Sequence, residues 1–117
     1  MKALVYEGKR NLVLNEVEMP KVLQGKVLIK VAYTGICGSD ILLWNDKYPR
    51  VKPPVIIGHE FSGVVEEIGE GVTNVNVGDR VVVEPLITCG ECHACTSGEY
   101  NLCNALGLIG IDTDGAM

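Results

Sequence analysis

The sequence predicts a mainly β domain in which short strands form a barrel-like arrangement. Short runs rich in Val and Ile recur along the chain, and such residues favour the pleated, half-buried surface of a sheet. Turn-forming Gly, Pro, Asn and Asp separate these runs at close intervals, which is typical of all-β sandwiches and barrels. No segment has the helical apolar period of a long amphipathic helix.

The first third of the chain should form three strands, over residues 1–6, 11–17 and 26–34. The third strand alternates most clearly, and its side chains should divide between two faces, with Val27, Ile29, Val31 and Tyr33 on one and Leu28, Lys30 and Ala32 on the other. This strand leads directly to Cys37, so the thiol should lie at the end of a rigid element. A short helix capped by Ser39 or Asp40 should follow and end at Leu43 or Trp44.

Prolines and glycines divide the rest of the chain. Further strands are expected over residues 61–68, 80–84 and 106–111. An extended loop with three prolines, two turns and a lobe rich in Cys and Gly should lie between the strands, over residues 48–54, 69–71, 76–79 and 86–104. Gly63 lies inside an expected strand, and a glycine there indicates a bulge or a close approach of another backbone.

The composition excludes several classes of protein. A length of 117 residues suits one domain, and 47% apolar residues can form a core. A net charge of −5 argues against a nucleic-acid surface, which needs basic patches. The start of the chain acquires charge too quickly for a signal peptide, and no apolar run is long enough to span a membrane. We therefore expect a cytoplasmic protein, whose Cys clusters bind metal rather than form disulfides.

The motif Gly58-His59-Glu60, followed by Gly63 and Gly69, is the first candidate site. The imidazole of His59 is a common metal ligand. The carboxylate of Glu60 can bind a metal directly or orient a ligand. Upstream, Cys37-Gly38-Ser39-Asp40 offers a thiolate of the softness that zinc prefers. Alternatively, His59 is a half-buried histidine at a strand end and Cys37 a small buried apolar residue.

A second candidate site is formed by four cysteines with the spacing C-x2-C-x2-C-x7-C, namely Cys89, Cys92, Cys95 and Cys103. Four thiolates make a closed tetrahedral zinc site of the structural kind. The lobe has few large apolar residues, so a metal should organise it in place of a core. An iron–sulfur cluster is the competing use, although the Pro typical after the last Cys of ferredoxins is Asn104 here. His93 should face solvent and is not counted as a ligand.

Together these motifs resemble the zinc-dependent medium-chain dehydrogenase/reductase family, which includes the alcohol and polyol dehydrogenases. The resemblance covers nearly the whole chain, including the segment 77–81. It implies a GroES-like, partly open β-barrel with a four-cysteine zinc lobe. The family's Rossmann domain, with its Gly-x-Gly-x-x-Gly motif between a strand and a helix, has no counterpart in these residues. Residues 1–117 are therefore interpreted as the N-terminal part of a catalytic domain.

The resemblance also implies roles for individual residues. Cys37 and His59 would bind a catalytic zinc, with Glu60 as a third ligand or a close neighbour. Ser39 would take the proton of an alcohol whose hydride passes to NAD or NADP. The four cysteines of the lobe would hold a second, structural zinc, so the family favours zinc over iron and sulfide.

This sequence departs from the family in two ways. Many members carry a His a few residues after the Ser, and Leu42, Leu43 and Trp44 occupy that region here. The third protein ligand of the family would lie beyond Met117. Residues 1–117 alone are therefore expected to keep the structural zinc and to lack dehydrogenase activity.

The segment Glu84-Pro85 and the run Cys-Gly-Ser-Asp resemble the sorbitol, threonine, butanediol and galactitol-phosphate dehydrogenases. A small alcohol or polyol substrate and a homodimer or homotetramer are expected, without nucleic-acid or membrane partners. Trp44 and Tyr48 could line a substrate pocket or simply pack. The alternative functions are a non-catalytic zinc-binding or co-chaperonin-like module and, disfavoured by the acidity, a zinc-ribbon nucleic-acid binder.

Overall fold

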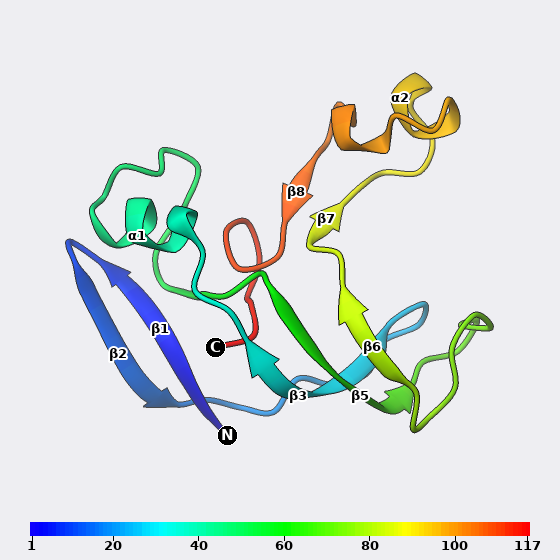
Figure 1. The fold of residues 1–117 in the computed structure, drawn as a ribbon, viewed down its shortest axis with the longest axis horizontal. Coiled ribbons are helices and arrows are strands. Elements are labelled where there is room, and N and C mark those ends of the chain that lie inside the picture. The colour runs from blue at the N-terminus through cyan, green and yellow to red at the C-terminus, as the bar shows by residue number, and fades with distance from the viewer.

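A computed structural model describes all residues of the chain, 1–117. Eight strands, two short helices and one 3-10 turn follow one another along it (Figure 1). They are β1 (Lys2–Gly8), β2 (Asn11–Glu16), β3 (Val27–Thr34), α1 (Gly38–Trp44), β4 (Val55–Ile56), β5 (Phe61–Ile68), β6 (Arg80–Val83), β7 (Leu86–Ile87), α2 (His93–Thr96), η1 (Tyr100–Leu102) and β8 (Gly107–Leu108). The prediction of a mainly β domain is confirmed.

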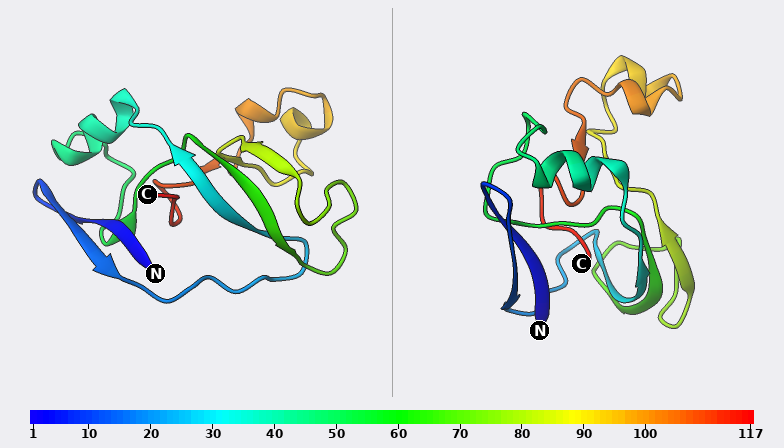
Figure 2. Two further views of the ribbon diagram at one scale, coloured as in Figure 1. Left: turned by 60° about the horizontal axis from the view of Figure 1, so that its bottom comes forward. Right: turned by 60° about the vertical axis from the view of Figure 1, so that its left-hand side comes forward.

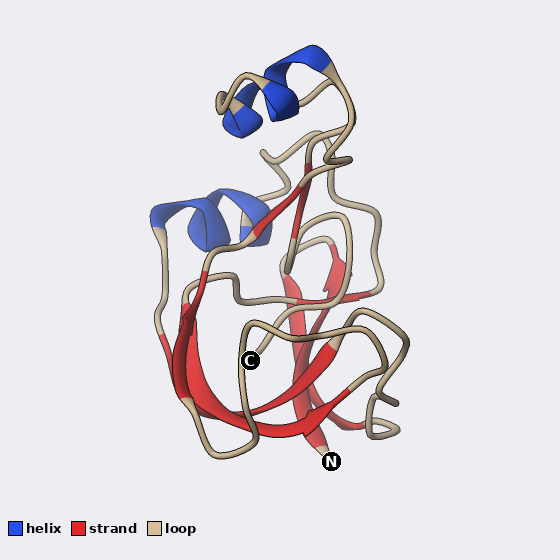
Figure 3. Ribbon diagram, turned by 90° about the vertical axis from the view of Figure 1, so that its right-hand side faces the viewer, coloured by secondary structure: helices blue, strands red, loops and turns tan.

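The strands form three antiparallel sheets, in the orders β2-β1-β4, β3-β5-β6 and β7-β8. The β1–β2 hairpin lies on one side of the molecule and the β3–β5–β6 sheet on the other, with the C-terminal segment between them (Figure 2). The helices lie toward one end, where α2 belongs to a lobe that projects from the sheets (Figure 3). None of the helices has the length and apolar character that a membrane crossing requires.

A buried tyrosine fixes the β1–β2 hairpin against the loop that follows α1. The Tyr6 hydroxyl donates a hydrogen bond to the carboxylate of Asp46, which also accepts one from the backbone amide of Lys9 at 3.0 Å. Burial and this carboxylate raise the pKa of Tyr6 to about 12. Lys9 and Arg10, in the hairpin turn, have positive φ values of 53° and 62°. Asp46 thus stabilises a turn whose backbone conformation costs energy for residues other than glycine.

The predicted close approach at Gly63 is confirmed. A Cβ atom there would lie 2.3 Å from the carbonyl oxygen of Lys30 on β3. The regular two-face alternation expected for β3 is wrong only after Val31, however. There Ala32 is an extra residue, because Val31 and Tyr33 pair with the adjacent residues Gly63 and Ser62. Tyr33 therefore lies on the opposite face from Val31. A second shift, between Leu28 and Ile29, places its extra residue, Glu66, on β5.

The helix α1 begins two or three residues earlier than expected. Its N-cap is Cys37, not Ser39 or Asp40. Asp40 lies at the third helical position and accepts a hydrogen bond from the Cys37 amide at 2.7 Å. An acidic residue at this position reaches back to the cap, as in a capping box, so Asp40 still stabilises the helix start.

The last expected strand, 106–111, is shorter than predicted. Only Gly107–Leu108 form β8, because the chain turns at Gly110, whose φ is 76°. The segment after this turn pairs with residues just before His59: the amides of Gly115 and Met117 donate to the carbonyls of Ile56 and Ile57 at 2.7 and 2.9 Å. The C-terminal segment therefore braces the backbone that carries the candidate site.

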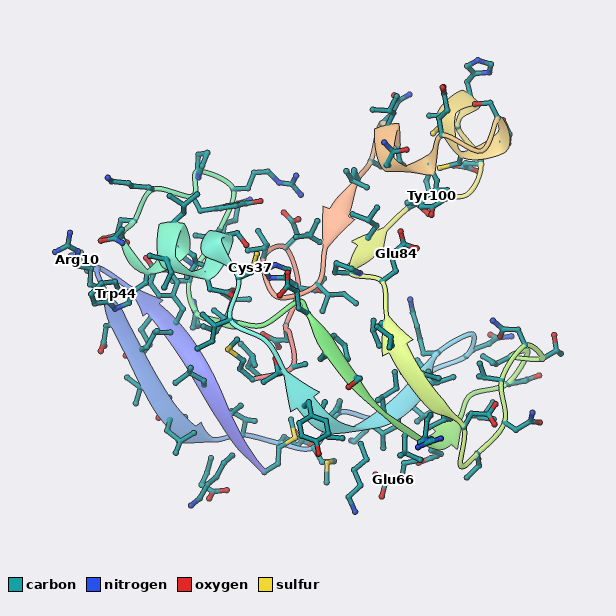
Figure 4. The ribbon with its side chains drawn as sticks, viewed as in Figure 1. Arg10, Cys37, Trp44, Glu66, Glu84 and Tyr100 are labelled. Carbon is teal, nitrogen blue, oxygen red and sulfur yellow. The ribbon has the colours of Figure 1, made fainter.

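The core lies where the hairpin, α1 and the C-terminal segment meet. Its buried side chains are Tyr6, Leu43, Val55, Ile57 and Ile111. Tyr48 packs against this cluster. The Trp44 ring donates a hydrogen bond to the Arg10 carbonyl at 3.1 Å and lies 5.6 Å from the Arg10 guanidinium, as Figure 4 shows. Both aromatic residues therefore have packing roles in this structure.

Replacing Leu43 with alanine should destabilise the domain strongly. Its side chain is 0% exposed, so the variant would leave a cavity that costs about 2–5 kcal/mol of unfolding free energy. The matched control is Leu42→Ala on the same helix, where the side chain is 47% exposed and the loss should stay below about 1 kcal/mol. Chemical denaturation of the two variants checks this. Equal losses would show that α1 does not pack as described.

Candidate functional site

The antiparallel pairing of β3 with β5 brings the first candidate site together. Thr34, at the end of β3, pairs with Phe61, at the start of β5. Cys37 follows the last residue of β3, and His59-Glu60 precede the first residue of β5. All three residues therefore lie at the same end of this strand pair. Their ligand atoms lie within 4.8 Å of one another. Figure 4 shows Cys37 at the start of α1, near the start of β5 and the C-terminal segment.

The imidazole of His59 is held between two polar groups of α1. Its Nε2 atom lies 3.2 Å from the Ser39 hydroxyl, and its Nδ1 atom lies 3.5 Å from a carboxylate oxygen of Asp40. His59 is 6% exposed and Asp40 is 4% exposed. A carboxylate facing Nδ1 favours the proton on that nitrogen and leaves the Nε2 lone pair for a metal.

The donor set at this site fits zinc. A thiol sulfur, an imidazole nitrogen and a carboxylate oxygen are ligands that zinc accepts. In addition, Nδ1 of His59 and Oδ1 of Asp40 are buried without a hydrogen-bond partner. Buried polar atoms are rarely left unpaired, and these two atoms face each other at 3.5 Å, so a proton on Nδ1 directed at Oδ1 would serve both.

Asp40 contacts both Cys37 and His59, although the sequence pattern indicated it only as a helix cap. The signal was present in the sequence, since Asp40 follows Cys37 by three residues and such residues lie on one face of a first helical turn. Each of its carboxylate oxygens has a different contact: Oδ2 accepts a hydrogen bond from the Cys37 amide, and Oδ1 faces Nδ1 of His59.

A cleft of about 500 Å³ opens beside His59 and Glu60. Its other lining residues come mainly from the ends of β3, β5 and β6, and include Tyr33, which is 79% exposed. Trp44 and Tyr48 do not line this cleft. A pocket wall made by these two aromatic residues is therefore not part of this site.

The four cysteines of the lobe form the second site. All are free thiols, and their sulfurs are separated by 3.5 Å (Cys92–Cys95), 3.5 Å (Cys89–Cys103) and 3.9 Å (Cys89–Cys95). A tetrahedral zinc with Zn–S bonds of about 2.3 Å places its sulfurs about 3.8 Å apart. The cluster therefore already has nearly the dimensions of a zinc–thiolate site.

Backbone amides around this cluster are arranged for thiolates. The amides of Cys89 and Ala105 point at the Cys103 sulfur, and that of Cys92 points at the Cys89 sulfur, each at 3.4 Å. Hydrogen bonds from the Asn104 and Cys95 backbone lower the pKa of Cys92 to about 6. Burial, followed by the bond to Cys92, raises the pKa of Cys95 to about 12. A metal bound by the four sulfurs would displace the proton that this raised pKa keeps on Cys95.

The lobe is separate from the first site and is tied to the sheets at its base. It projects beyond β7 and β8 in Figure 1, away from α1. The Tyr100 hydroxyl donates a hydrogen bond to the Glu84 carboxylate at 3.2 Å, which joins the 3-10 turn to the end of β6 (Figure 4). His93 is exposed on α2 and is absent from the group of metal-ligand candidates, as expected.

A small open β-barrel with one four-sulfur cluster and one mixed Cys, His and Glu cluster defines a metal-binding domain of the zinc dehydrogenase class. The comparison with protein families agrees, since the alcohol dehydrogenase GroES-like domain matches residues 23–117. The chain belongs to this family, and the GroES-like fold inferred from the sequence is confirmed.

Several relatives are dehydrogenases. L-threonine 3-dehydrogenase of Pyrococcus horikoshii is 50% identical over 105 residues, which cover 87% of this chain and 30% of that protein. Sorbitol dehydrogenase of Halalkalibacterium halodurans is 49% identical over 119 residues, 99% of this chain and 34% of that protein. The structure of an Escherichia coli alcohol dehydrogenase with NADH superposes with a TM-score of 0.91 at 40% identity, covering 99% of this chain and 34% of that one. The chain spans about a third of the length of these relatives.

Replacing Asp40 with asparagine should weaken metal binding at the first site. The amide can still accept from the Cys37 backbone, but its NH2 group would then face Nδ1 of His59 and favour the tautomer protonated on Nε2. Loss of such an outer carboxylate costs about 10–100-fold in metal affinity. Competition with a chelator measures it. Unchanged affinity in Asp40→Asn would show that Asp40 does not orient the ring.

Proposed function

We propose that residues 1–117 form the N-terminal, metal-binding part of the catalytic domain of a zinc-dependent alcohol or polyol dehydrogenase. The proposed reaction oxidises a secondary alcohol and uses NAD or NADP. The observation that carries this proposal is the grouping of Cys37, His59 and Glu60 at one sheet edge, with the Ser39 hydroxyl 3.2 Å from His59.

The residues of this chain have distinct tasks in the proposed reaction. Cys37 and His59 hold the metal, and Glu60 lies beside it as a ligand or as a nearby negative charge. Zinc bound there supplies Lewis-acid polarisation of the substrate hydroxyl, while the nicotinamide accepts the hydride. Asp40 keeps the Nδ1 proton on His59, so Nε2 stays available to the metal.

The proton of the substrate passes to Ser39. Its hydroxyl can accept one proton while it donates its own onward. Asp40, the next residue on α1, is engaged with His59, and Ile41, Leu42 and Leu43 after it are apolar, so the helix offers no further titratable group for the proton. Water carries the proton onward in this proposal.

The names of the relatives support a polyol or hydroxylated substrate. They include a threonine dehydrogenase, a sorbitol dehydrogenase and a galactitol-1-phosphate dehydrogenase, the last with a TM-score of 0.91 at 33% identity. The four-thiol lobe fits a reducing compartment such as the cytoplasm. The direct test is to follow nicotinamide reduction by the whole protein with sorbitol, threonine and 2,3-butanediol, each with NAD and NADP. No turnover with any of these secondary alcohols, in protein that contains both metals, would contradict the proposed substrate class.

Replacing Ser39 with alanine should reduce turnover by about 10²–10⁴-fold, the usual contribution of a positioned proton acceptor. The matched control is Ser97→Ala, which removes a hydroxyl that only donates to the Ala94 carbonyl in the lobe. Turnover must be measured under conditions in which hydride transfer limits the rate. A slower reaction with substrate deuterated at the reacting carbon identifies those conditions. Normal turnover of Ser39→Ala under these conditions would remove Ser39 from the proton path.

A further inference from the structure

Gly35, two residues before Cys37, lies directly against Glu60. The Gly35 amide donates a hydrogen bond to the Glu60 carbonyl at 2.7 Å. The neighbouring Thr34 hydroxyl donates to the same oxygen at 3.4 Å. The backbone of Glu60 is therefore anchored to the end of β3, and only its exposed side chain is free to move.

The Glu60 side chain lies close to the place that a side chain at position 35 would occupy. A Cβ atom built on Gly35 has Oε2 of Glu60 as its nearest neighbour, at 3.1 Å, followed by the Cβ and the carbonyl oxygen of Glu60 at 3.5 and 3.7 Å. The two longer distances are ordinary contacts. At 3.1 Å the contact with the carboxylate oxygen is tighter than most, so the carboxylate would have to move by a few tenths of an ångström to admit a methyl group.

Backbone conformation does not explain this glycine. Gly35 is not among the glycines with positive φ, whereas Gly58, beside the same site, has a φ of 98°. Alanine at position 35 is therefore compatible with the backbone, and space is what distinguishes the two residues. Gly38, in the same segment, also lacks a positive φ, and nothing lies within 4 Å of the place that a methyl group would occupy there.

We propose that Gly35 is a positioning residue for the first metal centre: its missing side chain leaves the room in which the Glu60 carboxylate lies within reach of Cys37 and His59. The inference rests on the metal site proposed above. Because two hydrogen bonds hold the Glu60 backbone, a methyl group at position 35 is accommodated by a shift of the carboxylate away from its present place. The centre then loses either a ligand or the negative charge beside the metal.

The experiment compares four variants of the whole protein with the four-cysteine site filled with zinc. They are Gly35→Ala, Glu60→Ala, the double variant Gly35→Ala/Glu60→Ala, and the control Gly38→Ala. The affinity of the first site for Co²⁺ is measured by chelator competition, and the Co²⁺ absorption spectrum reports its ligand geometry. A structural role in the sheet would not alter that spectrum.

We expect Gly35→Ala and Glu60→Ala to weaken Co²⁺ binding to a similar extent, about 10–100-fold, and to change the spectrum in the same way. The double variant should be no weaker than either single variant, because both changes remove the same interaction. Gly38→Ala should match the unmodified protein. If Gly35→Ala alone does not fold, the double variant should fold again, because it lacks the carboxylate that the methyl group meets.

Several results would overturn the inference. Normal Co²⁺ binding in Gly35→Ala, with weakened binding in Glu60→Ala, would leave the metal site intact and remove Gly35 from it. Additive losses in the double variant, or failure of that variant to restore folding, would show that Gly35 acts by another route. If the unmodified protein binds no Co²⁺ at Cys37 and His59, the proposed function itself fails, together with this inference.

Discussion

Replacing Cys92 with serine is expected to empty the four-cysteine site and unfold the lobe over residues 86–104. A hydroxyl is a poor substitute for a thiolate as a zinc ligand. The lobe contains few buried residues, and Cys103 is the only buried one of its four sulfur ligands. Structural zinc in small domains contributes about 10–16 kcal/mol of binding free energy that is also folding free energy. The variant should therefore lose one metal ion and melt at a clearly lower temperature.

The matched control for this variant is Cys37→Ser, the same chemical change at the other site. It should remove the other metal ion and abolish turnover while the lobe stays folded. Calorimetry with metal analysis separates the two outcomes. A Cys92→Ser protein that keeps its full metal content and melting temperature would show that the lobe does not depend on a metal.

Replacing His59 with alanine is expected to abolish dehydrogenase activity and remove the metal of the first site. Lewis-acid stabilisation by a metal is worth several kcal/mol, which corresponds to a loss on the order of 10³-fold or more in turnover. The matched control is His93→Ala, the other histidine of the chain, which is exposed on α2. That variant should keep both metal ions and normal turnover.

Because His59 is buried, His59→Ala could lose activity by unfolding, so the folding of the variant must be measured as well. Far-ultraviolet circular dichroism and retention of the lobe metal provide that check. A folded His59→Ala protein with near-normal turnover would contradict the assignment of His59 to the catalytic centre. Loss of the lobe metal in His93→Ala would show that the exposed histidine is a ligand after all.

Local sequence patterns predicted most of the strands. The run 61–68 forms β5 with the expected bounds, because β-branched residues and flanking glycines agree with the pairing. The turns at 69–71 and 76–79 also lie outside the strands. The predictions that failed concern features that depend on contacts between segments distant in the sequence. The last strand is short because Gly110 turns the chain against Gly58, where a Cβ would lie 2.7 Å from the Gly58 carbonyl.

The alternation of β3 failed for a similar reason. Register shifts come from how β3 fits β5, and a single strand read alone contains no record of its partner. The approach of Gly63 to the Lys30 carbonyl was predicted as a close contact, but the extra residue Ala32, which places Tyr33 on the other face of β3, was not.

At the candidate sites, too, local sequence patterns predicted some features, and others depend on contacts between distant residues. The spacing of the four cysteines predicted a closed cluster, because short loops can bring their sulfurs together. The grouping of Cys37 with His59 and Glu60 came from the family resemblance, since no local rule joins residues so far apart in sequence. Asp40 was assigned only to the helix because its second oxygen meets His59 across the fold. Its contribution to the site became evident only from the three-dimensional arrangement.

The most direct test of the two metal sites is the metal content of the intact protein and of the variants Cys92→Ser and Cys37→Ser. We expect about two zinc ions per chain in the unmodified protein and about one in each variant, with a different ion lost in each case. The remaining ion in Cys37→Ser should have four sulfur ligands in X-ray absorption, and that in Cys92→Ser should have mixed ligands. Iron with inorganic sulfide in the lobe, or a single zinc that both variants lose, would contradict the presence of two separate zinc sites.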